Sequence, residues 1–285
     1  MKRVLIAGCG YVGKATADLF QAAGWEVEGW TRSPESAAHC SCERYRVRAV
    51  DIADRKPVEK AASEFGVVIH CASTRGGRAE NYRRIYFEGA RNLLEVLPAF
   101  RFIFCSSTSV YAQTSGEWVD EESATRPAHE TGKILRETEE VVRRKGGIVA
   151  RLAGIYGPGR SALLRKFLSG EARLENGGKR YLNQVHRDDI AAALFLLATL
   201  PNEMGIVNVC DNEPMTQREC YEWLATTLNR PLSLRAEATG ERKRGASNKR
   251  VSNRKLCGLR WEPQFPSFGT GMKHSVLPDY PRLGA

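Results

Sequence analysis

The fold is decided by residues 4–13, which read VLIAGCGYVG. A short apolar run ends in a G-x-G-x-x-G turn, and a helical pattern follows as far as Ala23. In such a turn Gly8 permits the tight bend, Gly10 lets the backbone approach a pyrophosphate, and Gly13 lets helix and strand pack closely. The free N–H groups at the start of the helix attract phosphate. Placed between a predicted strand and a predicted helix, this stretch predicts a dinucleotide-binding loop.

The size and composition of the chain fit a globular protein with a large core. It has 285 residues, of which 42% are hydrophobic. No apolar run approaches the roughly 20 residues that a membrane span needs, and we expect no membrane association. The chain enters a strand almost at once, so no signal peptide is expected. The eight cysteines are scattered along the chain. They indicate reduced thiols and a cytoplasmic location rather than a disulfide framework.

A metal site is not expected. The segment His39-Cys40-Ser41-Cys42 carries potential ligands, but no second ligand pair lies at the spacing of a zinc site. The absence of that second pair favours a protein without a metal.

The formal net charge is +10, and much of the excess lies between Arg235 and Arg260. This segment contains Arg242-Lys243-Arg244 and Lys249-Arg250. It is either a solvated face or a basic pocket for an anionic substrate such as a nucleotide diphosphate. Nucleic-acid binding is the least favoured interpretation, because no helix-turn-helix, zinc-finger or aromatic RNA-binding signature accompanies the charge.

Apolar strand-like runs alternate with helical patterns in the first half of the chain. The strand-like runs are residues 4–7, 26–30, 46–50, 67–71, 102–106 and 148–152, and the helical patterns are residues 12–23, 57–65, 79–97 and 130–145. Nearly continuous apolar strands that alternate with helices indicate a parallel sheet covered on both faces. We therefore predict an α/β fold, a Rossmann-type doubly wound parallel sheet with a smaller C-terminal lobe. Residues 1–154 would form the dinucleotide-binding domain, whose sheet would also receive later elements, and residues 155–285 the substrate lobe, which closes over the carboxyl edge of the sheet.

Further segments resemble, in order, the motifs of one family. They are Asp51-Ile52, residues 68–72 (VIHCA), 89–94 (GARNLL), 106–111 (SSTSVY), 151–159 (RLAGIYGPG), 185–189 (VHRDD) and 207–209 (VNV). Together they are similar to the extended short-chain dehydrogenase/reductase family, the NAD(P)-dependent sugar epimerases and dehydratases. The resemblance implies a Rossmann fold, a nicotinamide cofactor and a hydroxyl or carbonyl substrate.

The catalytic positions depart from the family pattern. The family uses a Y-x-x-x-K helix, in which Tyr moves a proton and Lys binds the nicotinamide ribose, and a Ser or Thr that polarises the substrate oxygen. The resemblance assigns the serine to Ser107 and the lysine to Lys133, with Glu137 one turn later. His129 stands where the family has Tyr, and Tyr86 where it has a helix Asn. These changes indicate a divergent branch of the family.

Which residue moves the proton in place of the missing tyrosine is therefore left open. The usual pKa of histidine, about 6.5, would let His129 act as an acid or base near neutral pH. The ammonium of Lys133, one helical turn away, would however disfavour the protonated form of His129. Alternatively, His129 is only an exposed residue at the start of a helix. Tyr86 is another phenol predicted near the carboxyl edge of the sheet.

The second strand ends in residues 29–33 (GWTRS) without an acidic residue to hold the ribose hydroxyls. Arg32 can pair with a 2′-phosphate and Ser33 can donate a hydrogen bond to it, which favours NADP over NAD. The predicted cofactor-binding residues are Gly8, Gly10, Tyr11, Val12, Gly13, Thr31, Arg32, Ser33, Asp51, Ile52, Cys71, Ala72, Ser73 and Lys133.

The candidate substrate-binding residues are Tyr86, Thr108, Arg160 and Arg187, of which the arginines would meet an anionic group. The sequence thus predicts an NADP(H)-dependent oxidoreductase or epimerase/dehydratase that acts on a sugar nucleotide or another hydroxyl or carbonyl small molecule. The alternative is a catalytically impaired NADP-binding redox sensor. Relatives often dimerise through the helices that correspond to residues 79–97 and 130–145, which makes a homodimer one expectation.

Overall fold

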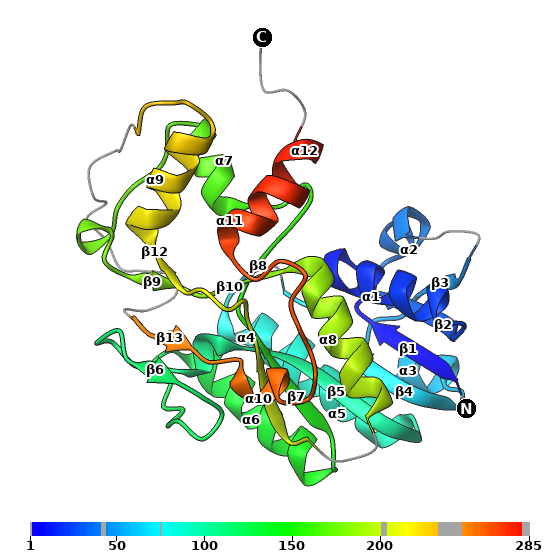
Figure 1. Ribbon diagram of the computed structural model, residues 1–285. Coiled ribbons are helices and arrows are strands. Elements are labelled where there is room, and N and C mark those ends of the chain that lie inside the picture. The colour runs from blue at the N-terminus through cyan, green and yellow to red at the C-terminus, as the bar shows by residue number, and fades with distance from the viewer. Residues whose placement is uncertain (1, 41–43, 75, 201–203, 233–246, 281–285) are drawn as a thin grey trace.

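The computed structural model describes residues 2–40, 44–74, 76–200, 204–232 and 247–280 (Figure 1). Seven strands form its central sheet in the order β11-β7-β5-β4-β1-β2-β3, and every neighbouring pair is parallel. Their bounds are β1 (Arg3–Ala7), β2 (Glu26–Thr31), β3 (Arg46–Ala49), β4 (Phe65–His70), β5 (Ala99–Ser107), β7 (Ile148–Leu152) and β11 (Ile206–Val209). The predicted Rossmann-type parallel sheet is confirmed.

Helices cover both faces of the sheet, as a doubly wound fold requires. On one face α1 (Tyr11–Ala22) packs against α8 (Arg187–Thr199). On the other lie α3 (Arg55–Ala61), α5 (Gly89–Val96) and α6 (Glu130–Arg144), which contact one another. The predicted helix over residues 79–97 is α4 (Ala79–Tyr82), the π-helical turn η1 (Arg83–Glu88) and α5 in continuous succession. The central strands β1, β4, β5 and β7 are therefore buried on both sides.

Three short strand pairs lie outside the central sheet. They are β8 (Gly154–Tyr156) with β10 (Gln184–His186), β9 (Tyr181–Leu182) with β12 (Met215–Thr216), and β6 (Trp118–Val119) with β13 (Arg250–Val251). One of them, β6 with β13, joins the first half of the chain to its later part. A second hydrophobic cluster lies among α7 (Ala162–Leu168), α9 (Gln217–Thr227) and α11 (Phe268–Gly271), at the top of Figure 1. This group of helices stands above the carboxyl edge of the sheet.

The C-terminal region contains short elements that the sequence analysis did not predict. Among the described residues after Arg230 they are β13, α10 (Arg254–Cys257), α11, η4 (Met272–Val276) and α12 (Leu277–Asp279). These elements are too short to give a periodic pattern, and tertiary packing stabilises them. Trp261, Phe265 and Phe268 are all buried, and the Ser267 hydroxyl caps α11. The helix α2 (Pro34–Cys40) was not predicted either.

Among the described residues, no helix has the length and apolar character needed to cross a bilayer. Those same residues contain no cluster of three or more side chains able to hold a metal ion. Ser41, Cys42 and the basic run Arg242-Lys243-Arg244 lie outside the described residues.

Candidate functional site

The glycine turn that follows β1 leaves open space beside its backbone at Gly10. Gly8 has φ of +104°, a conformation that favours glycine, and a Cβ on it would lie 2.2 Å from the backbone nitrogen of Ala72. A Cβ on Gly13 would lie 2.2 Å from the carbonyl oxygen of Gly8. Gly10, by contrast, has nothing within 4 Å of its Cβ position. The turn is therefore closely packed at Gly8 and Gly13 and open at Gly10. The N–H groups in the first turn of α1, which follows Gly10, have no acceptor within the helix.

Three strand ends meet at this turn. The backbone nitrogens of Gly8 and Cys9 both donate to the carbonyl oxygen of Trp30, each at 2.9 Å, which ties β1 to the end of β2. The Cys71 thiol donates to the carbonyl oxygen of Gly8 at 3.3 Å, which ties β1 to the end of β4. Burial raises the pKa of Cys71 well above its usual range, so its thiol stays protonated. The predicted cofactor residues at the ends of β1, β2 and β4 are thus brought together.

The end of β2 carries a free guanidinium. Arg32 is exposed, and among the described residues it has neither a hydrogen-bond nor an ion-pair partner. The Thr31 hydroxyl donates to the carbonyl oxygen of Ser33 at 3.5 Å. The Ser33 hydroxyl accepts a hydrogen bond from the nitrogen of Ser36, and its bond to Glu35 lowers the pKa of that carboxyl. One arginine and one carboxylate therefore follow the carboxyl end of β2.

Asp51 and Ile52 follow β3 at the same edge. The carboxylate of Asp51 accepts from the Arg84 guanidinium at 2.5 Å and from the nitrogen of Ala53 at 3.1 Å. Ile52 is buried, and its carbonyl oxygen accepts from the Asn92 side chain at 2.9 Å. The ion pair between η1 and the loop after β3 was not predicted, because no local pattern marks a contact between residues this far apart.

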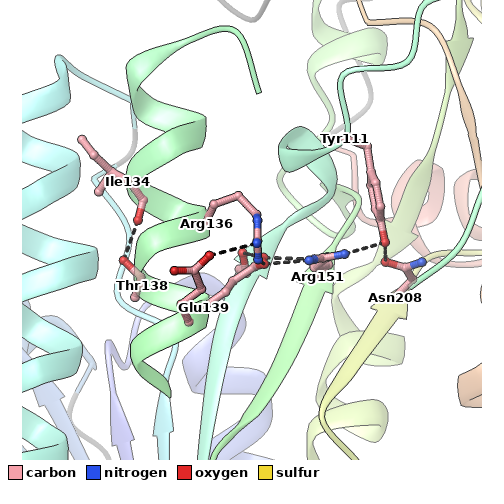
Figure 2. A network of polar contacts seen from close by, with 9 residues as sticks. Tyr111, Ile134, Arg136, Thr138, Glu139, Arg151 and Asn208 are labelled. Atoms are coloured by element: carbon pink, nitrogen blue, oxygen red, sulfur yellow. Dashed lines mark hydrogen bonds and ion pairs between the residues drawn. The ribbon is translucent and has the colours of Figure 1, made fainter. Parts of the chain in front are cut away.

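Ser107 ends β5, and a buried polar network holds the residues on either side of it (Figure 2). The Ser106 hydroxyl donates to Oε1 of Glu139 on α6 at 2.6 Å. Arg151 on β7 binds the same carboxylate through Nε at 3.0 Å and Nη2 at 2.7 Å. Its Nη1 donates to the Tyr111 hydroxyl at 2.8 Å, and Tyr111 donates to Oδ1 of Asn208 at 2.9 Å.

This network fixes the turn that presents Ser107. Ser106 before it is bonded to α6, and Tyr111 after it is bonded to β7 and β11. Between them, η2 (Thr108–Val110) begins with the Ser107 hydroxyl accepting from the nitrogen of Ser109 at 3.2 Å. The hydroxyl hydrogen of Ser107 therefore remains available for an acceptor. Thr108 is buried as the first residue of η2.

Tyr86 on η1 brings a phenol to the end of β4. Its hydroxyl donates to the Ser73 hydroxyl at 3.3 Å. Its ring packs near His70 and Phe104, with centroid distances of 6.4 and 6.2 Å. Burial raises the pKa of Tyr86 above its usual value. Because β4 and β5 are neighbours in the sheet, Ser73, which follows β4 and binds Tyr86, and Ser107, which ends β5, belong to adjacent strands.

Lys133 and His129 do not lie where the sequence analysis expected them. Helix α6 turns one face toward the sheet, and the buried residues on it include Leu135, Thr138 and Val142. At 3.6 residues per turn Lys133 lies on roughly the opposite side of the helix. Its side chain is 59% exposed, with Nζ 3.4 Å from Oε2 of Glu130.

Lys133 lines an open hollow on this outer surface together with Arg126, Arg136, Glu137 and Glu140. His129 is the exposed residue before α6, and its side chain makes no capping hydrogen bond. In this structure the side chain of Lys133 therefore points away from the sheet that carries Ser107. Glu137 also points outward and pairs with Arg83 at 2.9 Å, whereas Glu139 is the buried carboxylate.

Arg160 and Arg187 converge on the first residue of α1. Their guanidinium carbons lie 5.2 and 5.1 Å from the centroid of the Tyr11 ring. The Tyr11 hydroxyl donates to the carbonyl oxygen of Pro158 at 3.0 Å, and Arg187 also binds Asp188 at 2.8 Å. The arginines that follow β8 and β10 thus stand beside the open end of the glycine turn, where an anion would meet both.

Known proteins resemble this chain in sequence and in fold. The model of the NAD dependent epimerase/dehydratase family matches residues 4–210. The chain belongs to this family. It is 27% identical to protein YeeZ of Escherichia coli K12 over 278 residues, 93% of this chain and 97% of YeeZ.

Solved structures share the fold over nearly the whole chain. A Methylobacillus flagellatus structure described as an NAD-dependent epimerase/dehydratase is 27% identical, with a TM-score of 0.78 over 95% of this chain and 96% of that one. The UDP-glucose 4-epimerase of Thermotoga maritima, solved with UDP-glucose, is 18% identical, with a TM-score of 0.83 over 96% of this chain and 97% of that one.

Proposed function

We propose that this protein is an NADP(H)-dependent oxidoreductase that acts on a hydroxyl or carbonyl small molecule with an anionic group, such as a sugar nucleotide. The observation that carries the proposal is that Ser107 ends β5 while the Tyr86 phenol binds Ser73, which follows the neighbouring strand β4. Solved neighbours with UDP-glucose or NAD bound support the choice of substrate and cofactor class.

The residues at and beside the glycine turn fit both the pyrophosphate and the 2′-phosphate of NADP. The open space above Gly10 and the start of α1 would receive the pyrophosphate. The guanidinium of Arg32, which has no partner among the described residues, would pair with the 2′-phosphate of NADP, and Asp51 would lie near the adenine. Glu35 is the competing feature, since a carboxylate near the ribose favours NAD.

We further propose that both the tyrosine and the lysine of the family motif are absent. Glu139, rather than Glu137, is the carboxylate of α6 that is buried and bonded to Ser106. If Glu139 is the family's glutamate, the motif moves by two residues, and its tyrosine and lysine fall at Thr131 and Leu135. Leu135 is buried and lies on the sheet-facing side of α6. Neither residue can move a proton at neutral pH or bind a ribose as a cation.

In this proposal Ser107 and Tyr86 perform the proton chemistry. The Ser107 hydroxyl donates a hydrogen bond to the substrate carbonyl oxygen, and the Tyr86 phenol donates the proton that completes the alcohol. Bound NADPH would supply the hydride. Because burial raises the pKa of Tyr86, the residue stays a protonated acid at neutral pH. It therefore suits carbonyl reduction better than alcohol oxidation, which needs the phenolate.

The test is a turnover screen with reduced cofactor. The protein is loaded with NADPH, pooled small-molecule carbonyl compounds are added in fractions, and the absorbance of the reduced nicotinamide is followed. We expect at least one fraction to oxidise the cofactor with the wild-type protein and not with Ser107→Ala. Equal rates for the two proteins would contradict the proposed role of Ser107.

A redox-sensing NADP-binding protein is the second candidate. The observation that favours it is the outward orientation of Lys133 together with the apolar Leu135 on the inner face of α6. This candidate predicts tight NADPH binding without oxidation by any fraction in the same screen. It also predicts that Ser107→Ala leaves NADPH affinity unchanged.

A further inference from the structure

A buried histidine lies beside the helical turn that carries Tyr86. His70 is the last residue of β4, and its side chain is 0% exposed. Its Nε2 lies 3.2 Å from the carbonyl oxygen of Ile85 on η1. A carbonyl oxygen can only accept a hydrogen bond, so the proton of the neutral imidazole is on Nε2. His70 therefore donates a hydrogen bond from the end of β4 to the backbone of η1.

The backbone bonding of η1 explains why the Ile85 carbonyl is available to His70. In an α-helix the nitrogen of Gly89 would donate to the carbonyl oxygen of Ile85, four residues earlier. In this π-helical turn it donates to the carbonyl oxygens of Arg84 and Tyr86 instead. Nε2 of His70 thus takes the place that the Gly89 amide leaves at Ile85. Single π-helical turns are rare and are frequent at functional sites.

The imidazole also packs against the aromatic rings around it. Its centroid lies 6.4 Å from that of the Tyr86 ring, with an interplanar angle of 27°, and 5.2 Å from that of the Phe104 ring. A Cβ on Gly89 would lie only 3.6 Å from Nε2 of His70, so the glycine permits this close approach. The Tyr86 hydroxyl then donates to Ser73, three residues after His70. His70 therefore contacts the turn that presents the phenol, and its own chain carries the acceptor.

The second ring nitrogen of His70 keeps the imidazole neutral. Nδ1 is buried and has no hydrogen-bond partner among the described residues. A proton on Nδ1 would have no acceptor there, and burial lowers the pKa of His70 to about 4. At neutral pH His70 is therefore a fixed hydrogen-bond donor to the backbone and not an acid in the reaction.

We propose that His70 is a positioning residue, whose hydrogen bond to Ile85 keeps η1 in the π-helical turn that places the Tyr86 hydroxyl at Ser73. Without this bond we expect η1 to change to α-helical bonding, in which the Gly89 amide binds the Ile85 carbonyl again. That change rewinds the turn and moves the phenol away from Ser73. The inference rests on the proposed function, because the position of Tyr86 matters to the reaction only if its phenol supplies the proton.

Three variants of the full-length protein separate the hydrogen bond from stability. His70→Leu removes the donor, whereas His70→Gln keeps an N–H donor on a side chain of similar length. Leu197→Ala is the control for lost stability, because it empties a fully buried position. That position lies near the start of β5, where Arg101 binds the carbonyl oxygen of Leu197, whereas Ser107 ends the strand.

Hydrogen exchange of the cofactor-free proteins tests the bond to η1 without any substrate. The exchange rate of amides in residues 83–90 is divided by that of residues 134–142 on α6. We expect this ratio to rise about tenfold or more in His70→Leu and to stay at the wild-type value in His70→Gln and Leu197→Ala. An unchanged ratio in His70→Leu would overturn the proposal. An equal rise in either of the other variants would also overturn it.

Carbonyl reduction tests whether His70 acts through Tyr86. His70→Leu should lower kcat about tenfold or more and leave NADPH affinity within about twofold of wild type, and His70→Gln should restore kcat. In the Tyr86→Phe background, His70→Leu should cause no further loss, because the group that it positions is already absent. Additive losses in the double variant, or a loss in KM alone, would contradict the positioning role.

Two outcomes separate this inference from the proposed function. If wild type reduces no carbonyl compound, the proposed function fails, and faster exchange of residues 83–90 in His70→Leu alone would still establish that His70 maintains η1. If Tyr86→Phe is slow and His70→Leu is as fast as wild type, the proposed function stands and the inference fails.

Discussion

Arg151 and Glu139 form an ion pair that is buried between β7 and α6, with side chains 1% and 0% exposed and two hydrogen bonds of 3.0 and 2.7 Å. The same carboxylate binds the Ser106 hydroxyl, and the same guanidinium binds Tyr111. The pair therefore connects the scaffold of the sheet to the turn that carries Ser107.

Breaking this pair should destabilise the protein strongly. Arg151→Met leaves the buried Glu139 with only the partly exposed Arg136 as a counter-ion, so we expect a loss of about 3 kcal/mol in the free energy of unfolding. Urea denaturation measures the loss. The double variant with Glu139→Leu should recover part of it, because both charges are then absent. A loss below about 1 kcal/mol, as for an exposed pair, would contradict the structural role.

Tyr86→Phe should separate catalysis from binding. If the Tyr86 phenol supplies the proton, the substitution should lower the rate of carbonyl reduction about 10²–10⁴-fold and leave NADPH affinity unchanged. With wild type, reduction should keep its rate beyond a pH of about 10, the ordinary pKa of tyrosine, because burial raises the pKa of Tyr86. Steady-state rates across pH check both points. A Tyr86→Phe protein as fast as wild type would remove Tyr86 from the mechanism.

Lys133 and His129 should be dispensable. Lys133 is on the outer side of α6 and His129 is exposed, so Lys133→Ala and His129→Ala should each leave NADPH affinity and reduction rate within about twofold of wild type. Calorimetric titration and the turnover assay provide the values. A large loss of cofactor affinity in Lys133→Ala would restore the lysine to the ribose site and overturn the outward placement of Lys133 on α6.

The sequence predicts best those features that are set by residues close together in the chain. The turn over residues 4–13 was predictable because the steric roles of Gly8 and Gly13 are set within the segment. The outward placement of Lys133 was not evident from the motif alone, because the motif does not report which face of the helix is buried. The apolar spacing of Ile134, Leu135, Thr138 and Val142 would have placed Glu139 on the buried face.

Other parts of the site had no local signal at all. The ion pair of Arg84 with Asp51 and the hydrogen bond from His70 to Ile85 both depend on contacts between separate segments. Such contacts are created only when the chain folds, and no periodicity along the sequence reports them. The basic character of residues 235–260 was evident, but not which of its cations is buried.

His70 should make stability depend on pH. Burial lowers the pKa of His70 from 6.5 to about 4. Between these values the unfolded state takes up the proton first, so stability is full above about pH 6.5 and falls by about 3 kcal/mol as the pH drops to about 4. His70→Gln should flatten this part of the profile relative to wild type, as followed by denaturation at several pH values. Identical profiles for the two proteins would show that His70 does not cause the pH dependence.

Cofactor choice should depend on Arg32. Arg32→Ala removes the guanidinium proposed to bind the 2′-phosphate, so NADPH affinity should fall about 10–100-fold while NADH affinity changes little. Glu35→Gln is the matched control at the same strand end, and it should not weaken NADPH binding. A preference for NADH that Glu35→Gln abolishes would instead assign the ribose hydroxyls to Glu35.

Calorimetric titration of the wild-type protein with NADPH and with NADH tests the proposed cofactor site most directly. Both dinucleotides should bind at the turn over residues 8–13, and NADPH should bind more tightly because Arg32 meets its 2′-phosphate. Absence of binding by either dinucleotide, or tighter binding of NADH, would contradict the proposed function.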